Sequence, residues 1–175
     1  QTIVKPNHQG GTVKTFENGI ELEGVKEIEL RIVSNSSYYR KNYKSENIKQ
    51  LSRAENYSFE DIKGRHIRDH QTLFNRVDFD IITNNKLQRI PTDKRLNAIK
   101  EGALDLELQE TLFHFGRYLL IASARPNTLP ATLQGLWNQH INAPWNADYH
   151  LNINLQMNYW LANLTQLDEL NSPLF

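Results

Sequence analysis

Carboxamide side chains alternate with apolar ones near the end of the chain, in the stretch HLNINLQMNYW at residues 150–160. In an extended segment, side chains two residues apart point to the same side. Asn152 and Asn154 can therefore share one pocket, while the apolar residues between them anchor the backbone. Gln156 and Asn158 are expected within the start of a helix, so they need not face that pocket. A carboxamide donates and accepts hydrogen bonds but, being neutral, is a poor base.

A structural role for the same residues stays open. Asn is a preferred N-cap of α-helices, so Asn154 could simply cap a helix that begins near Leu155. The residue types alone do not separate this role from chemistry, and the two are compatible in neighbouring residues.

The segment just before these amides is expected to be an ordered, functional loop. Residues 125–150 contain prolines, many amides and two tryptophans. A loop longer than about 15 residues inside a compact protein is usually functional or disordered. The tryptophans and the apolar residues between them argue against disorder.

Helices are predicted around this loop and before it. Ser58 and Asp61 form a capping box that opens a helix over 59–77, with apolar residues and two histidines on one face. A shorter helix has Thr92 as N-cap and Gly102 as its stop. The apolar periodicity is strongest over 105–124, and its residues are Leu108, Leu112, Phe115, Leu119 and Ala122. A final amphipathic helix is expected to begin near Met157 and to run to Pro173.

The first third of the chain is predicted to be β-structure. Asn18-Gly19 between two alternating segments is a strong hairpin signal. The stretch at 26–34 alternates Ile28, Leu30 and Ile32 with charged residues, as in a half-buried strand. Residues 35–50 are polar and tyrosine-rich, which indicates a loop or helix lead-in, and 77–81 alternate like a short strand.

Composition excludes several classes of function. Acidic and basic residues are equal in number, 20 each, which argues against a nucleic-acid partner. No apolar run approaches the roughly 18 residues of a membrane span. The chain has no cysteine, so disulfides and thiolate metal sites are excluded. No phosphate-binding glycine loop is present, and no cofactor is expected.

A histidine pair on the helix at 59–77 resembles a zinc motif without matching it. His66 and His70 have the His-x-x-x-His spacing, with Asp69 between them. Zinc proteases of this kind require Glu directly after the first histidine, and Ile67 stands there. We expect no metal site; the histidines are expected to pack at a domain junction.

The last third of the chain resembles a known family. Its distinctive residues are Arg125-Pro126, Leu129-Pro130-Ala131, Leu133-Gln134-Gly135, Trp137-Asn138, Pro144-Trp145, Asn152-Ile153-Asn154 and Gln156 to Trp160. At this spacing they resemble glycoside hydrolase family 95, the inverting α-L-fucosidases. Residues 65–81 and 90–96 resemble the same family more weakly.

The resemblance implies a fold. An α+β fragment is expected, with β-strands of a sandwich tail followed by a helical linker and the first helices of an (α/α)6 barrel. The implied boundaries are 1–50 for the C-terminal part of the N-terminal β-sandwich, 51–92 for the linker and 93–175 for the start of the catalytic domain. The chain offers too few helices to bury its own apolar faces, so it is expected to be a piece of a larger protein.

The resemblance also implies a mechanism, hydrolysis of α-linked fucosides with inversion. Asn152 and Asn154 match the two catalytic-site asparagines, and Asn154 is the expected water-activating amide, with Asn152 helping to hold water or sugar. The family's general-acid glutamate and the aspartate that polarises the amide lie outside this chain. The isolated chain is therefore expected to be inactive, because the leaving oxygen must be protonated.

Further residues are implied in substrate binding: Trp137, Trp145, His150 and Gln134. An aromatic face stacks on the C–H face of a deoxysugar, although core packing of either tryptophan stays open. His150 could bind a hydroxyl or be purely structural. Arg125 is expected to tie down the loop through backbone carbonyls.

Two rival functions stay open. One is a non-catalytic, sugar-binding remnant; the other is a related (α/α)6 enzyme, an α-L-galactosidase or a glycoside phosphorylase. The expected partners are a fucosylated oligosaccharide or glycan and the remainder of the catalytic domain. The expected location is periplasmic or extracellular, as for an exported bacterial protein.

Overall fold

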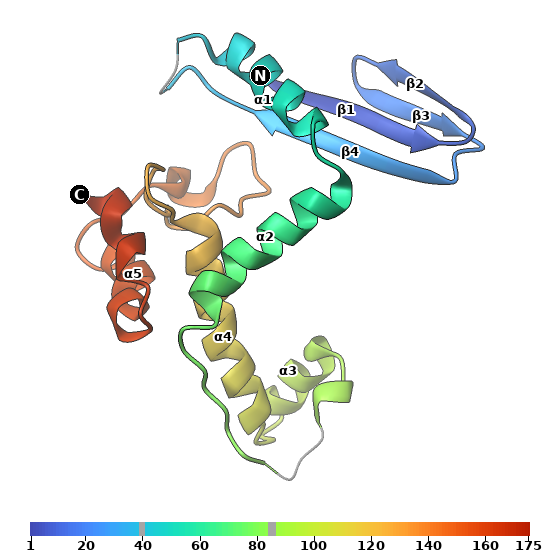
Figure 1. Cartoon of the computed structure of the whole chain (residues 1–175). Coiled ribbons are helices and arrows are strands. Elements are labelled where there is room, and N and C mark those ends of the chain that lie inside the picture. Colours follow the sequence, from blue (N-terminus) through green and yellow to red (C-terminus); the bar gives the residue numbers. More distant parts are fainter. Residues whose placement is uncertain (39–40, 84–86) are drawn as a thin grey trace. The chain divides into compact units, whose positions relative to one another are not determined.

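The computed structural model describes residues 1–38, 41–83 and 87–175. The chain is of the α+β class and forms two compact units, unit 1 (Gln1–Ile67) and unit 2 (Arg68–Phe175). Figure 1 shows strands confined to the first part of the chain and helices in the rest. In the described part of the chain, no helix is both long enough and apolar enough to cross a membrane.

Unit 1 contains two nested antiparallel hairpins. The strands are β1 (Thr2–Gln9), β2 (Thr12–Phe16), β3 (Gly19–Glu23) and β4 (Glu27–Ser34). β1 pairs with β4 from Thr2↔Ser34 to Gln9↔Glu27, and the β2–β3 hairpin is the connection between them. The predicted hairpin at Asn18-Gly19 is confirmed, with Phe16 opposite Gly19.

Glycine makes the step between the two hairpins possible. Gly11 has φ +61°, and a Cβ at this position would lie 2.2 Å from the carbonyl oxygen of Glu23. A side chain cannot fit there, and the left-handed backbone also favours glycine.

The prediction that Ile28, Leu30 and Ile32 form the buried face of β4 is wrong. These three side chains are exposed, and the opposite, polar face is the more buried one. Helix α1 (Tyr43–Glu55) contacts β4, and Arg31 of β4 donates to the carbonyl oxygens of Ala54 and Tyr57. Alternation specifies two faces of a strand, but not which of them a neighbouring element covers.

Helix α1 begins inside the segment predicted as loop or helix lead-in. Residues 39 and 40 of that segment lie outside the described part of the chain. The domain boundaries predicted at 50/51 and 92/93 stay predictions.

Helix α2 (Phe59–Phe74) begins with the predicted capping box. The Asp61 amide donates to Ser58 Oγ at 3.1 Å, and the Ser58 amide donates to Asp61 Oδ2 at 3.1 Å. The Ser58 hydroxyl also donates to Asp61 Oδ2 at 2.6 Å, and this bond, together with the one from the Ser58 amide, holds the pKa of Asp61 below its usual value. The helix ends three residues before the predicted Val77.

The strand predicted at 77–81 is absent, because side chains of α4 take up its backbone groups. Helix α4 (Leu106–Ser123) runs beside this segment. Arg117 donates to the carbonyl oxygen of Val77 at 2.7 Å, and the Ile81 amide donates to Glu110 Oε2 at 3.0 Å. With these partners the segment needs no neighbouring strand.

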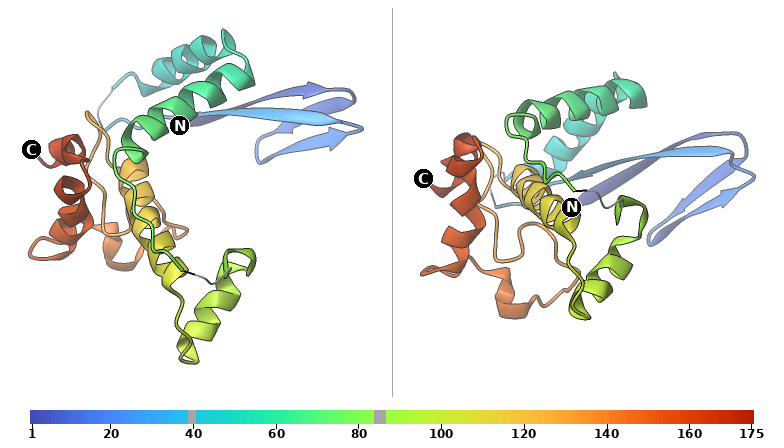
Figure 2. Two further views of the ribbon diagram at one scale, coloured as in Figure 1. Left: turned by 60° about the horizontal axis from the view of Figure 1, so that its bottom comes forward. Right: turned by 90° about the horizontal axis from the view of Figure 1, so that it is seen from below.

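The boundaries of α3 and α5 differ slightly from the prediction. Helix α3 (Thr92–Lys100) follows the short helix η1 (Leu87–Arg89); its N-cap is Pro91 rather than Thr92, and Gly102 follows it with φ +97°. Figure 2 shows α3 beside the N-terminal end of α4. Helix α5 (Asn154–Leu164) does not run to Pro173, which lies inside a separate short helix, η3 (Asp168–Leu174).

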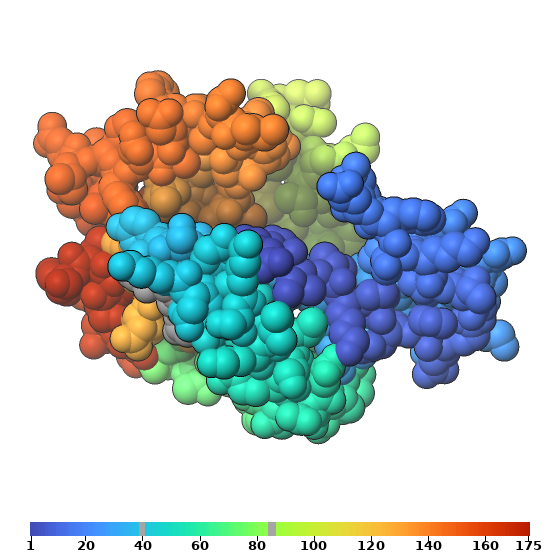
Figure 3. All heavy atoms as spheres, turned by 90° about the horizontal axis from the view of Figure 1, so that it is seen from above, coloured from blue at the N-terminus to red at the C-terminus, as the bar shows by residue number. Residues whose placement is uncertain are grey.

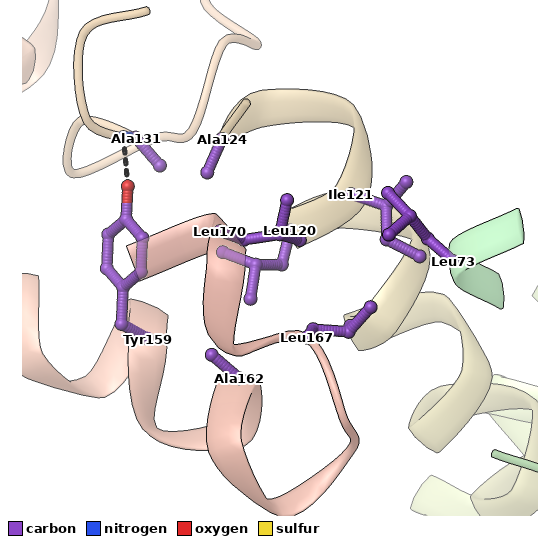
Figure 4. Close-up of a cluster of buried hydrophobic side chains, with 9 residues drawn as sticks. All are labelled: Leu73, Leu120, Ile121, Ala124, Ala131, Tyr159, Ala162, Leu167 and Leu170. Atoms are coloured by element: carbon purple, nitrogen blue, oxygen red, sulfur yellow. Dashed lines mark hydrogen bonds between the residues drawn. The ribbon is translucent and has the colours of Figure 1, made fainter. Parts of the chain in front are cut away.

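The hydrophobic core of unit 2 gathers α2, α4, α5 and η3. Its members are Leu73, Leu120, Ile121, Ala124, Ala131, Tyr159, Ala162, Leu167 and Leu170. Figure 4 shows these side chains converging, with the Tyr159 hydroxyl turned toward Ala131. The predicted face of α4 is only partly right: Leu108 is buried, but Leu112 and Phe115 are exposed.

Candidate functional site

The segment that carries Asn152 and Asn154 is a turn, not an extended strand. His150 has φ +44° and Asn152 has φ +97°, both in the left-handed region. Residues 151–153 form turns, and Asn154 is the first residue of α5. The prediction that Asn152 and Asn154 lie in an extended segment is therefore wrong. Non-glycine residues with positive φ cluster at functional sites more often than elsewhere.

Neither asparagine caps α5. The N-cap is Ile153, and the helix has no side-chain capping hydrogen bond. Asn152 and Asn154 are both exposed. The alternative role of Asn154 as an N-cap is thus wrong, and its carboxamide stays available for a ligand at the N-terminal end of the helix.

His150 and Trp145 are brought together. Their rings lie edge to face with centroids 6.4 Å apart, and His150 Nε2 lies 3.3 Å from the Trp145 carbonyl oxygen. Trp145 belongs to the short helix η2 (Pro144–Ala147), where its φ of +48° interrupts the helical geometry. Trp145 is 75% exposed, so it lies at the surface and not in the core.

Gln134 and Trp137 lie on a tight turn earlier in the same loop. The Thr132 and Gly135 backbones bond each other in both directions, at 3.2 and 2.9 Å, and the Trp137 amide donates to Gln134 O at 3.1 Å. Gly135 has φ +66°, and a Cβ there would lie 2.8 Å from Trp137 Cζ3. Glycine therefore lets the indole ring lie against the turn.

A cavity of about 280 Å³ lies between this turn, α4 and α5. Gln134 and Trp137 line it, together with Asn158 and apolar residues of both helices. Among the described residues, the buried Oε1 atom of Gln134 has no hydrogen-bond partner, so it is available as an acceptor for a ligand. A second hollow of about 580 Å³ is lined by Gln134, Trp137 and residues 138–140.

The six predicted site residues thus fall into three groups. Gln134 and Trp137 share the two hollows, Trp145 contacts His150, and Asn152 and Asn154 lie at the start of α5 without lining either hollow. One backbone bond, from the Leu133 amide to Asp148 O at 3.1 Å, joins the turn to the segment before His150. Figure 3 shows the atoms of this loop, in orange, at the surface.

Sequence reasoning missed two residues of α5 that bind the turn. Asn158 Nδ2 donates to Thr132 O at 2.9 Å, and the Ala131 amide donates to the Tyr159 hydroxyl at 2.7 Å. Burial raises the pKa of Tyr159, so the hydroxyl stays protonated. The local sequence signal for these contacts is only that polar side chains lie on the buried side of a helix.

Arg125 anchors the start of the loop, as predicted. Its Nε donates to Ile121 O at 2.9 Å, and its guanidinium also pairs with Asp69 of α2. The His70 ring stacks on Phe74 with centroids 5.2 Å apart and lies edge-on to Tyr118. In the described ranges, no group of three or more His, Cys, Asp or Glu side chains could hold a metal ion.

Comparison with known proteins adds an independent observation. Residues 58–175 match the glycosyl hydrolase family 95 catalytic domain. "Alpha-L-fucosidase 2" of Arabidopsis thaliana is 44% identical over 132 residues, covering 73% of this chain and 16% of the relative. "Probable alpha-fucosidase A" of Aspergillus niger is 35% identical over 188 residues, covering 99% of this chain and 24% of the relative. The chain thus spans a quarter or less of the length of these relatives.

Proposed function

Because this chain belongs to glycosyl hydrolase family 95, we propose that it carries the water-activating amides of an enzyme that hydrolyses α-linked L-fucosides with inversion. Two of the relatives it matches are named α-fucosidases. The observation that carries the proposal is the pair of exposed carboxamides, Asn152 and Asn154, at the start of α5, where neither serves as a cap.

In the proposed reaction Asn154 accepts a hydrogen bond from the attacking water through its carbonyl oxygen. Inverting enzymes usually use two carboxylates about 6.5–9.5 Å apart, one as acid and one as base. A neutral amide can replace the base only if a carboxylate hydrogen-bonds its NH2 group and increases the electron density on its oxygen. That carboxylate and the general acid are assigned to the part of the enzyme outside this chain.

Asn154 is the first residue of α5, and its carboxamide is exposed. As the water oxygen attacks the anomeric carbon, the amide oxygen takes up the proton that the water loses, and the NH2 group gives one to the carboxylate outside this chain. The general acid protonates the leaving oxygen in the same step. Asn152, two residues earlier, would help to hold the water or the sugar.

Sugar binding is assigned to Gln134, Trp137, Trp145 and His150. The buried, unpaired Oε1 of Gln134 can accept a hydrogen bond from a sugar hydroxyl. A buried acceptor without a partner is costly, and this bond would satisfy it. The exposed faces of Trp137 and Trp145 suit the C–H face and methyl group of a deoxysugar.

We extend the proposal to the fold. Residues 1–50 form the tail of a β-sandwich, 51–92 a linker, and 93–175 the first helices of an (α/α)6 barrel, in an exported enzyme. An open groove of about 480 Å³ between α3 and α4, lined by Leu96, Ile99, Leu108, Leu112 and Phe115, supports the need for further helices. The isolated chain is then inactive, because it lacks the acid.

A sugar-binding role without catalysis is the second candidate. The residues that line the 280 Å³ cavity include no carboxylate, which suits binding better than hydrolysis. Calorimetry of this chain with L-fucose, combined with an assay of fucoside hydrolysis by the intact protein, separates the two. Binding by the chain, with no fucoside hydrolysis by the intact protein, would favour the second candidate.

The deciding experiment is Asn154→Ala in the intact enzyme, assayed on an aryl α-L-fucoside. General acid–base catalysis contributes about 10²–10⁴-fold, so kcat is expected to fall at least about 100-fold with KM changed little. Asn163→Ala, at the opposite, exposed end of α5, is the matched control and should keep its activity. Proton NMR of the first product checks inversion, which gives the β-anomer. Unimpaired turnover by Asn154→Ala would refute the mechanism.

A further inference from the structure

Two consecutive residues of α5 hold two consecutive residues of the loop. The Tyr159 hydroxyl accepts from the Ala131 amide at 2.7 Å, and Asn158 Nδ2 donates to Thr132 O at 2.9 Å. Tyr159 is 6% exposed and Ala131 is 3% exposed. Hydrogen bonds between buried residues are costly to break, because each polar group would be left without a partner.

The turn that follows is closed by its own hydrogen bonds, so its geometry depends little on the surroundings. The Thr132 hydroxyl adds a bond to Gly135 O at 3.0 Å to the two backbone bonds between these residues. The Gln134 amide lies 3.4 Å from Thr132 Oγ1, and the Trp137 amide bonds Gln134 O. Once Ala131 and Thr132 are fixed, Gln134 and Trp137 are fixed with them.

We propose that Asn158 and Tyr159 are positioning residues for substrate binding. They hold Gln134 and Trp137 at a set place relative to Asn154, which lies on the same helix. Tyr159 does not line the 280 Å³ cavity, and Asn158, which does, uses its Nδ2 to bind Thr132 O. This inference rests on the proposed function, since it requires that Gln134 and Trp137 bind the substrate.

The arrangement separates binding from chemistry. Asn154 belongs to α5 itself, so loosening the turn leaves the water-activating amide in place. Gln134 and Trp137 belong to the turn, so they move when its two attachments are lost. The prediction is therefore a rise in KM with little change in kcat, the reverse of the effect expected for Asn154→Ala.

The test uses Tyr159→Phe and Asn158→Ala in the intact enzyme. Tyr159→Phe keeps the ring in the core and removes only the acceptor of the Ala131 amide. Each variant is expected to raise KM about 3- to 10-fold, with kcat within about 2-fold, as expected for lost uniform binding. Tyr118→Phe removes a hydroxyl from a half-exposed ring of α4 and should change neither constant.

Hydrogen exchange measured on the same enzymes gives a readout independent of activity. In Tyr159→Phe, amides of residues 131–137 are expected to exchange faster, while the amides of α5 keep their protection. If the exchange rates and KM both stay at the wild-type values, or if only the melting temperature falls, the positioning role is refuted. A loss of kcat at constant KM also refutes it. If wild type has no fucosidase activity, the proposed function fails, and unchanged exchange in Tyr159→Phe would then refute the attachment itself.

Discussion

Arg117 carries a positive charge into the interior of unit 2. It is 1% exposed, and its guanidinium donates to Phe74 O and Val77 O at 2.7 Å each and lies over the Phe74 ring. Desolvation lowers the pKa of Arg117, although it remains charged at neutral pH. Arg117 thus binds the last residue of α2 and the segment that follows it, and holds both against α4. Its role is structural.

Arg117→Met tests that role. The substitution keeps an unbranched side chain but leaves two carbonyl oxygens without their donor, and we expect a loss of about 2–4 kcal/mol in the free energy of unfolding. Urea unfolding followed by circular dichroism measures it. Arg68→Met, at an exposed position of α2, is the control and should stay within about 0.5 kcal/mol. Equal midpoints for the two variants would contradict the assignment.

At the level of the helices, one ion pair joins α3 to α4. Arg95 Nε and Nη2 donate to the two Asp105 carboxylate oxygens at 2.7 and 2.8 Å, and both side chains are buried. Asp105 is also the N-cap of α4, accepting from the Leu108 amide at 2.9 Å. The Asp105 carboxylate therefore caps α4 and also binds α3 through Arg95.

This pair predicts acid sensitivity. The hydrogen bond from Arg95 holds the pKa of Asp105 below its ordinary value of 3.8, so the stabilising contribution is complete above pH 3.8 and is lost as the pH falls through the folded-state pKa. Asp105→Asn should lose about 3–5 kcal/mol at pH 7, because it leaves Arg95 buried and unpaired. The difference from wild type should shrink below pH 3.8. Urea midpoints measured from pH 7 to pH 2.5 check both statements, and a difference independent of pH would contradict them.

The sequence predicts a helix where its signal lies within a few residues. It does not predict a contact whose partner is distant in the sequence. The capping box at Ser58 and the periodicity of 105–124 each lie within a few residues, and both helices are present. The strand at 77–81 failed because its backbone binds side chains of α4. Asn158 and Tyr159 were missed because their partners are main-chain atoms 26 and 28 residues away. The turn at His150 and Asn152 was missed because left-handed asparagine and histidine carry no sequence signal as clear as glycine.

At the scale of the molecule, α4 has one buried face and one exposed apolar face. Leu120 is 3% exposed and packs in the core of unit 2, whereas Leu112 is 68% exposed and lines the groove against α3. The proposed barrel supplies helices that would cover this groove. Exposed apolar area of this kind favours association with another surface, so the stability of this face should depend on the helices of the proposed barrel.

Leu112→Ala tests whether further helices cover the groove between α3 and α4. In this 175-residue chain alone, the free energy of unfolding should change by less than about 0.5 kcal/mol, because the side chain already meets solvent. In the intact protein, if the proposed barrel covers the groove, the same substitution should cost about 2–5 kcal/mol, as for a buried leucine. Leu120→Ala, on the same helix, should destabilise both forms by that larger amount. Denaturant unfolding of the two variants, each in both forms, gives the comparison. An equal small effect of Leu112→Ala in both forms would mean that no further helix covers α4, contrary to the proposed barrel.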